Sequence, residues 1–218
     1  MKNTTQQLFA FDQQYNQIIA GVDEVGRGPL AGPVVCACVV MPLDIPIDGI
    51  NDSKKISKAK LESLYQQITQ VALDYSVQAV DHTTIDQINI LQATKQCMRQ
   101  VISSIRCKID IVLVDYVNLG DTIQKITLQA ITKGDATSYN IAAASIVAKV
   151  TRDRLMQTQH TQYPQYGFDT NVGYGTPKHI QAIQQYGISP IHRKTFCQKW
   201  LNDPNNEQKA SQPNQSTQ

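Results

Sequence analysis

The chain has 218 residues and a mass of 24.3 kDa, which is enough for one compact domain and short for two. A hydrophobic fraction of 41% and a mean hydropathy of −0.30 are typical of a soluble globular protein, and no apolar run approaches the roughly 18 residues that a membrane span requires. The formal net charge of +2 is compatible with a polyanionic partner but does not require one. The composition therefore excludes membrane-spanning, collagen-like, coiled-coil and wholly disordered proteins.

Both ends of the chain are polar. The first residues, MKNTTQQ, have no apolar stretch behind their single Lys, so we expect no secretory signal and a cytoplasmic location. The five cysteines are odd in number and widely spaced, which favours reduced thiols and agrees with that location. We predict a flexible segment over residues 1–14, a single domain over residues 15–201 and a disordered polar tail over residues 202–218.

Apolar periodicity predicts both strands and helices along this domain. Runs of apolar or alternating residues predict strands at residues 17–25, 33–41, 75–79 and 109–115. Helical spacing of apolar residues predicts helices at residues 57–70 and 88–102. An Ala-rich stretch without Gly or Pro predicts a helix at residues 141–157, and Thr176-Pro177 before and Gly187 after residues 177–186 predict another. Strands followed by mixed helices and strands indicate the α/β class with a mixed sheet.

Acidic residues lie at the edges of these predicted elements. Asp23 and Glu24 end the first strand before a glycine-rich turn, Asp115 ends the buried run IDIVLVD, and Asp153 lies on the Ala-rich helix. Carboxylates that emerge from buried strands repel each other unless a cation neutralises them, so convergent Asp and Glu residues indicate a site for a hard metal ion. All-oxygen ligands favour Mg²⁺ or Mn²⁺ over zinc.

Each of these signals also has an ordinary structural explanation. Asp23 and Glu24 could end a strand at a solvated turn, and Asp115 could begin a turn. Asp153 could form an ion pair on the helix surface with neighbouring basic residues. Runs of Lys are most often solvated. Taken one at a time, the residues leave a metal site and a purely structural role both open.

Seven longer segments together resemble one family. In chain order they are AGVDEVGRGPLAGPVV, NDSKKIS, IDQINILQAT, KGDATSYNIAAASIVAKVTRDRLM, YPQYGF, GYGTPKHI and PIHRKTF, and the likeness extends over roughly residues 17–197. They resemble the motifs of bacterial ribonuclease HII, the type 2 ribonucleases H. The resemblance implies a ribonuclease H-like fold, in which a five-stranded mixed sheet is flanked by helices and followed by a C-terminal helical extension. It also implies hydrolysis of RNA in RNA–DNA hybrids, and a nick on the 5′ side of single ribonucleotides embedded in duplex DNA that leaves 3′-hydroxyl and 5′-phosphate ends.

The same resemblance implies a set of metal ligands. Asp23 and Glu24 match the family's first acidic pair, Asp115 matches the acid that ends the central strand, and Asp153 matches the helix carboxylate of TRDR. These four residues would hold two divalent cations, Mn²⁺ or Mg²⁺, that activate water and stabilise the departing O3′. Because adjacent residues of an ideal strand point to opposite faces, Asp23 and Glu24 can serve one site only if the backbone turns there.

The resemblance further implies residues that bind substrate. Gly26, Arg27 and Gly28 resemble a loop whose backbone contacts the 2′-hydroxyl, the group that distinguishes RNA from DNA. Tyr174 resembles the tyrosine that packs on the deoxyribose after the ribonucleotide. On their own, the glycines are also explained by a turn and Tyr174 by packing. Four further residues are expected to contact phosphate, Lys54, Lys55, Ser145 and Lys149.

The sequence departs from the family pattern after the strand-ending acid, where Tyr116 replaces the usual Gly, and HRKTF replaces the commoner HRRSF. Two alternative functions stay open: another two-metal nuclease of the same fold, and a catalytically silent binder of RNA–DNA hybrids. The expected partners are RNA–DNA hybrids and ribonucleotide-containing duplex DNA. We expect a monomer without an obligate protein partner and without membrane attachment.

Overall fold

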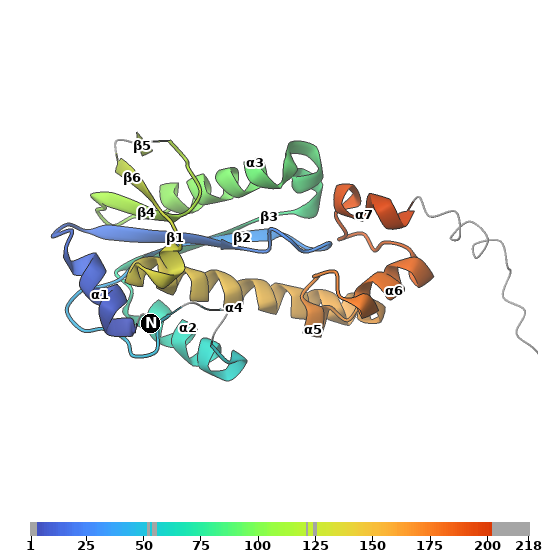
Figure 1. Ribbon diagram of the computed structural model, residues 1–218, viewed down its shortest axis with the longest axis horizontal. Coiled ribbons are helices and arrows are strands. Elements are labelled where there is room, and N and C mark those ends of the chain that lie inside the picture. The colour runs from blue at the N-terminus through green and yellow to red at the C-terminus, as the bar shows by residue number, and fades with distance from the viewer. Residues whose placement is uncertain (1–3, 52, 54–55, 121, 124–125, 202–218) are drawn as a thin grey trace, which may run out of the picture. The chain divides into compact units, whose positions relative to one another are not determined.

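The computed structural model describes residues 4–51, 53, 56–120, 122–123 and 126–201 (Figure 1). The described chain forms two compact units. The first contains the residues up to Arg27 and Pro33–Arg154, and the second contains Gly28–Gly32 and the residues from Leu155 onward. The expected disordered tail, residues 202–218, lies outside the described residues, and the single domain over residues 15–201 stays a prediction.

The first unit is built on a mixed sheet with the strand order β3-β2-β1-β4-β6-β5. Its strands are β1 (Ile19–Val25), β2 (Val34–Val40), β3 (Asp74–Val80), β4 (Ile111–Asp115), β5 (Thr122–Ile123) and β6 (Ile126–Ile131). β1 runs antiparallel to β2 and parallel to β4, and β6 also runs parallel to β4. Because β5 has only two residues, the expected five-stranded mixed sheet is confirmed, with one very short additional strand at its edge.

Helices cover both faces of this sheet (Figure 1). They are α1 (Thr5–Gln13), α2 (Lys58–Val71), α3 (His82–Ser103) and α4 (Tyr139–Gln162). The boundary between the two units falls inside α4, between Arg154 and Leu155. On one face, the Cys36 thiol of β2 donates to the Thr94 carbonyl of α3 at 3.9 Å. On the other face, Ala37 and Val39 pack with residues of α1, α2 and α4. Successive residues of a strand point to opposite faces, so β2 serves both layers and all seven of its residues are buried.

The strands and helices expected from apolar periodicity are present, with shifted ends. α3 begins well before the expected residue 88, because the Asp81 side chain accepts a hydrogen bond from the Thr84 N–H and caps the helix at its first turn. Asn89 interrupts this helix with a φ of 65°. Strand β6 was missed, although its sequence ITLQAI alternates apolar and polar residues at its start.

Residues 5–13, which we assigned to a flexible segment, form helix α1. The Thr4 side chain accepts from the Gln7 N–H, and the Gln7 side chain accepts from the Thr4 N–H, which is a capping box. Leu8 and Phe9 are buried, and the Phe9 ring meets the Tyr139 ring edge-on at a centroid distance of 5.2 Å. The helix is stabilised by this packing on α4, which the polar start of the sequence does not reveal.

The second unit is the expected C-terminal helical extension. It contains the short helices η3 (Pro164–Tyr166), α5 (Phe168–Asn171), α6 (Pro177–Tyr186) and α7 (Lys194–Leu201). The buried Arg193 donates to the Gly32 carbonyl from Nε at 3.0 Å and from Nη2 at 2.9 Å. The Leu30 N–H donates to the Gly173 carbonyl at 2.8 Å. These bonds tie the segment 28–32 to the C-terminal helices.

Two further expectations concern the cysteines and the membrane. All five cysteines are free thiols, and Cys36, Cys38, Cys97 and Cys197 are buried. None of the helices formed by the described residues combines the length and the apolar character needed to cross a membrane.

Candidate active site

Asp23 and Asp115 end two neighbouring parallel strands. In the register of β1 and β4, Val22 lies opposite Val114, so the next residues, Asp23 and Asp115, come side by side. Asp23 is only 5% exposed. Its pKa is raised well above the ordinary value, mainly because burial disfavours the charged form and further because the charges of Glu24 and Asp115 lie close to it. The structure thus brings these acids together at one edge of the sheet.

Glu24 follows Asp23 within β1, which is still a regular strand at this point. Asp23 pairs with Ala37 and Glu24 pairs with Cys36 on β2, and these partners face opposite sides of the sheet. The turn that we expected between the two acids comes only after the strand has ended. The Glu24 carboxylate instead accepts a hydrogen bond from Nη1 of Arg27 at 3.4 Å.

Helix α4 runs alongside β1 in the same direction. A Cβ on Gly21 would lie 2.1 Å from the carbonyl carbon of Asn140, and a Cβ on Gly26 would lie 2.2 Å from Nε of Arg152. Along the strand, the path from Gly21 to Gly26 is about 17 Å, and along the helix, the path from Asn140 to Arg152 is about 18 Å. Because the two path lengths are nearly equal, β1 and α4 run alongside each other from Gly21 to Gly26, and the middle of α4 lies beside Asp23.

Ser145 lies at this level of α4. Its hydroxyl forms a hydrogen bond with the Asp23 carboxylate, and its Oγ lies 2.9 Å from Oγ of Ser53. Two turns further along the same face, about 12 Å along the helix axis, lies Asp153. Lys149 Nζ donates to Asp153 Oδ1 at 2.7 Å, which is the ion pair that the sequence left as an alternative for Asp153. Both residues expected to contact phosphate on this helix, Ser145 and Lys149, therefore contact acids in this structure.

Asp115 is held by the short helix η2 (Gly134–Ala136). The Gly134 N–H donates to Asp115 Oδ1 at 2.6 Å, and a Cβ on Gly134 would lie 3.1 Å from that oxygen. The following residue, Tyr116, has a φ of 56° and a side chain that is 71% exposed. A positive φ is strained for a residue with a bulky side chain and free of strain for glycine.

The expected substrate-binding residues lie in both units. Gly26 has a φ of 93° and packs on the buried Arg152, whose Nε donates to the Pro33 carbonyl at 2.9 Å, so both conformation and space exclude a side chain at Gly26. In the second unit, a Cβ on Gly28 would lie 3.6 Å from Cε1 of Tyr174, so the Tyr174 ring lies beside the Gly28 backbone. Two of the expected phosphate contacts, Lys54 and Lys55, lie outside the described residues.

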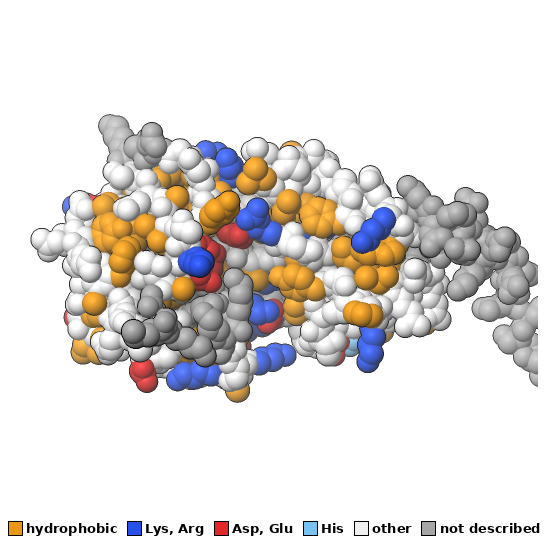
Figure 2. Space-filling model, viewed as in Figure 1, with side chains coloured by type: hydrophobic (Ala, Val, Ile, Leu, Met, Phe, Trp, Pro, Cys, Tyr) orange, Lys and Arg blue, Asp and Glu red, His pale blue; other side chains and the backbone are white. Residues whose placement is uncertain are grey.

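Acidic side chains gather on the visible face of the first unit, with Lys and Arg side chains next to them (Figure 2). As these side chains are oriented, the described part of the chain contains no group of three or more His, Cys, Asp and Glu side chains that converge on one ion. The donor set nevertheless fits a hard cation, because Asp23, Glu24 and Asp115 offer only oxygen atoms and their charges lie close together in a partly buried place.

Comparison with known proteins identifies the family. The family model described as Ribonuclease HII matches residues 20–199. The chain belongs to the ribonuclease HII family. As a ribonuclease HII it is a type 2 ribonuclease H, a metal-dependent hydrolase that acts as an endoribonuclease on RNA–DNA hybrids.

The similarity to known relatives extends over most of this chain and most of each relative. The chain is 48% identical over 201 residues to the ribonuclease HII of Ruminiclostridium cellulolyticum, covering 90% of this chain and 78% of the relative. It is 51% identical over 182 residues to the ribonuclease HII of Enterococcus faecalis, covering 84% and 70%. Among solved structures, the ribonuclease H2 of Pyrococcus horikoshii matches with a TM-score of 0.72 at 28% identity, covering 89% of this chain and 99% of that one.

Three residues at this candidate site were not predicted from the sequence. Ser53 contacts Ser145, Gly134 orients the Asp115 carboxylate, and Arg152 supports the backbone at Gly26. Of the three, Arg152 has the clearest sequence feature that predicts a specific role. It lies in an Ala-rich helix, where burying an Arg without a hydrogen-bonding partner would cost free energy. Ser53 and Gly134 carry no such signal, because their partners come from distant parts of the sequence.

Proposed function

We propose that this chain nicks duplex DNA on the 5′ side of single embedded ribonucleotides, as well as cutting longer hybrids, and that it uses two divalent cations, Mn²⁺ or Mg²⁺. The observation that carries the proposal is the pair of acids, Asp23 and Asp115, at the ends of adjacent parallel strands. Glu24 follows on the other side of β1, and its charge still raises the pKa of Asp23. Neighbouring carboxylates in a partly buried place resist being charged together unless a cation lies between them. The metal dependence of the family makes a cation the favoured explanation.

Four residues would hold the cations, namely Asp23, Glu24, Asp115 and Asp153. Bound there, the pair would activate the attacking water and stabilise the leaving O3′ of an in-line displacement. The protein itself supplies oxygen donors and fixes their orientation. The Gly134 N–H holds Asp115 Oδ1, and the Ser145 hydroxyl donates to Asp23. For Asp153 to serve as a ligand, Lys149 would have to share or release its oxygen atom.

The glycine loop and Tyr174 would distinguish RNA from DNA. We assign the backbone of Gly26, Arg27 and Gly28 to the 2′-hydroxyl, because glycine allows the main chain to approach a ribose closely. Tyr174, which is 42% exposed, would pack on the following deoxyribose, where a flat ring disfavours an additional hydroxyl. Lys149, together with Lys54 and Lys55, would contact phosphate, whereas the buried Ser145 is better suited to orienting Asp23.

The test is a nicking assay on a DNA duplex that contains one ribonucleotide, with Mn²⁺ or Mg²⁺ added. We expect a single nick on the 5′ side of the ribonucleotide, with 3′-hydroxyl and 5′-phosphate products. Asp115→Asn should abolish the nick. Asp110→Asn is the matched control, because it removes the same charge near the other end of β4, where Asp110 pairs with Lys108 at 3.2 Å and with the Ile18 N–H at 3.1 Å.

The two alternatives give different results in the same assay. If an all-DNA duplex is cut equally well, the chain is a general two-metal nuclease. If the duplex is bound and never nicked with either metal, the chain is a silent binder of hybrids. Either result would overturn the proposal.

A further inference from the structure

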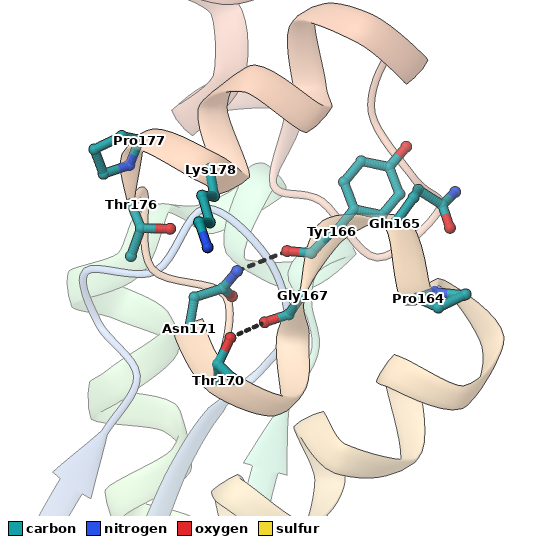
Figure 3. Close-up of a pocket in the computed structure, with 9 residues that line it drawn as sticks. All are labelled: Pro164, Gln165, Tyr166, Gly167, Thr170, Asn171, Thr176, Pro177 and Lys178. Atoms are coloured by element: carbon teal, nitrogen blue, oxygen red, sulfur yellow. Dashed lines mark hydrogen bonds between the residues drawn. The ribbon is translucent and has the colours of Figure 1, made fainter.

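Tyr174 lies in a loop of the second unit whose backbone is held on both sides. Before it, the Asn171 carbonyl accepts from the Tyr174 N–H at 2.9 Å. The Asn171 side chain donates to the Tyr166 carbonyl at 2.6 Å, beside a cavity of about 580 Å³ (Figure 3). After it, the Tyr174 carbonyl accepts from the Thr176 N–H and from Nδ1 of His179, both at 2.8 Å. The side chain is partly exposed, but its main chain is fixed.

His179 is one half of a buried pair of histidines. Its Nε2 lies 3.0 Å from Nε2 of His192, and the two side chains are 0% and 1% exposed. The ring centroids of Tyr166 and Phe168 lie 4.9 Å from His192 and 5.4 Å from His179, respectively. At the far end of the pair, Nδ1 of His192 accepts from the Ser189 N–H at 2.9 Å and lies 2.7 Å from the Ser189 hydroxyl oxygen, whose hydrogen can also point at it. The pair therefore links α6 to the segment that precedes α7.

The backbone at each end determines which ring nitrogens carry a hydrogen. A carbonyl only accepts, so Nδ1 of His179 must donate to Tyr174. A backbone N–H only donates, so Nδ1 of His192 must accept from Ser189. Two neutral rings then offer one remaining N–H, on His192, and one remaining lone pair, on His179, and these meet between the two Nε2 atoms. The hydrogen bonds run in one direction, from Ser189 through both rings to Tyr174.

This arrangement requires both rings to be neutral. A second proton on His179 would place two N–H groups face to face across 3.0 Å. A second proton on His192 would take the Nδ1 lone pair, break the hydrogen bond from the Ser189 N–H and leave only the Ser189 hydroxyl oxygen to accept it. Burial lowers the pKa of His179, which favours the neutral ring as well. The pair thus forms a rigid hydrogen-bonded connection between the Ser189 N–H and the Tyr174 carbonyl.

We infer that His179 and His192 are positioning residues for Tyr174, which hold its main chain and thereby set the angle of its ring beside Gly28. The inference rests on the role proposed above for Tyr174. Rotation of the Tyr174 backbone would move the ring relative to Gly28, because the segment 28–32 is held separately, by the Leu30 N–H that donates to the Gly173 carbonyl at 2.8 Å. The expected consequence is that the pair determines selectivity for single ribonucleotides.

The tautomers can be measured without any activity. In long-range ¹H–¹⁵N spectra of protein labelled at histidine, we expect His179 to carry its hydrogen on Nδ1 and His192 on Nε2, unchanged between about pH 6 and about pH 8. The opposite tautomer on either ring, or a charged ring at neutral pH, would overturn the inference whether or not the proposed function holds. His179→Asn and His192→Gln assign the two signals.

Activity then tests the link to Tyr174. His179→Phe removes the donor and keeps a ring, so we expect nicking at a single ribonucleotide to fall about tenfold relative to cleavage of a long hybrid, the scale of one lost hydrogen bond. His179→Asn, whose amide can still donate near the position of Nδ1, should recover most of that ratio. His160→Phe is the matched control, because His160 lies in the same unit and pairs with Asp169 at 3.4 Å. Its ratio should not change.

The substitutions are repeated in a Tyr174→Ala background. If His179 acts through Tyr174, His179→Phe has no further effect on the ratio there. Equal losses in both backgrounds, or a loss with His179→Phe that His179→Asn fails to recover although both variants fold, would mean a general structural role and would overturn the inference. If Tyr174→Ala itself leaves the ratio unchanged, the role proposed for Tyr174 fails, and the tautomer spectra still decide whether the histidines hold the loop.

Discussion

Asp12 is a buried acid beside the first turn of α4, and its replacement by Asn should change how stability depends on pH. Its Oδ2 accepts from the main-chain N–H and from Nδ2 of Asn140, both at 2.8 Å. Burial raises the pKa of Asp12 to about 6 from 3.8, although these hydrogen bonds lower it. The folded protein therefore holds this proton more tightly than the unfolded chain does. The contribution of Asp12 to the free energy of unfolding is fully present below about pH 4 and is lost as the pH rises through about 6.

The size of the effect follows from the two pKa values. A change from 3.8 to about 6 corresponds to a total loss of about 3 kcal/mol, at about 1.4 kcal/mol for each unit of pKa. Proton linkage places about 2 kcal/mol of this loss between about pH 4.5 and about pH 7.5. Asn has no proton to release in this range. Between those two pH values, the free energy of unfolding of Asp12→Asn should therefore rise by about 2 kcal/mol relative to that of the wild type, whatever the difference between the two proteins at the lower pH.

Urea unfolding at several pH values measures the free energy of unfolding of both proteins. Asp110→Asn is a suitable control, because the Ile18 N–H and Lys108 lower the pKa of Asp110, so its contribution is lost only at a more acidic pH. A difference between wild type and Asp12→Asn that stays constant within about 0.5 kcal/mol across the interval, or that changes with the opposite sign, would refute the reasoning.

Four further substitutions test the site and its supports. Asp115→Asn should abolish nicking while the melting temperature changes little, because it removes a carboxylate and almost no volume; full turnover at saturating Mn²⁺ would show that the site lies elsewhere. Tyr174→Ala should lower turnover on single ribonucleotides more than it weakens duplex binding, and parallel losses would assign it a packing role. Gly21→Ala should cost about 3 kcal/mol in urea unfolding, because its Cβ would lie 2.1 Å from Asn140, and a loss below about 1 kcal/mol would contradict this close packing. Tyr116→Gly should raise the free energy of unfolding by about 1 kcal/mol by relieving a φ of 56°, and an unchanged or lower value would show that the conformation is not strained.

The departure at Tyr116 shows how sequence and structure complement each other. The sequence identifies the position, since the family usually has Gly after the strand-ending acid. The structure supplies the reason, because the chain turns through the left-handed region immediately after Asp115 while the Gly134 N–H holds the carboxylate. A residue with an exposed side chain is accommodated at a cost in conformational energy rather than through a clash.

The sequence alone determined the elements whose signals are local. Alternating or continuous apolar residues located β1, β2 and β4, and an Ala-rich stretch without Gly or Pro located α4. The meeting of Asp23 and Asp115 could also be anticipated, since each residue ends a buried strand and the resemblance placed both in one site. These properties depend on the composition of short segments, which a sequence displays directly.

Tertiary structure decided everything that depends on a partner distant in the sequence. Glu24 lies on the other side of the sheet from Asp23 because the pairing with β2 keeps the strand regular up to its end. The four histidines are isolated in the sequence, yet His179 and His192 share a hydrogen bond whose direction is determined by two backbone groups. The direction of a hydrogen bond and the side of a sheet that a residue faces depend on neighbours that only folding brings together, so no local pattern can encode them.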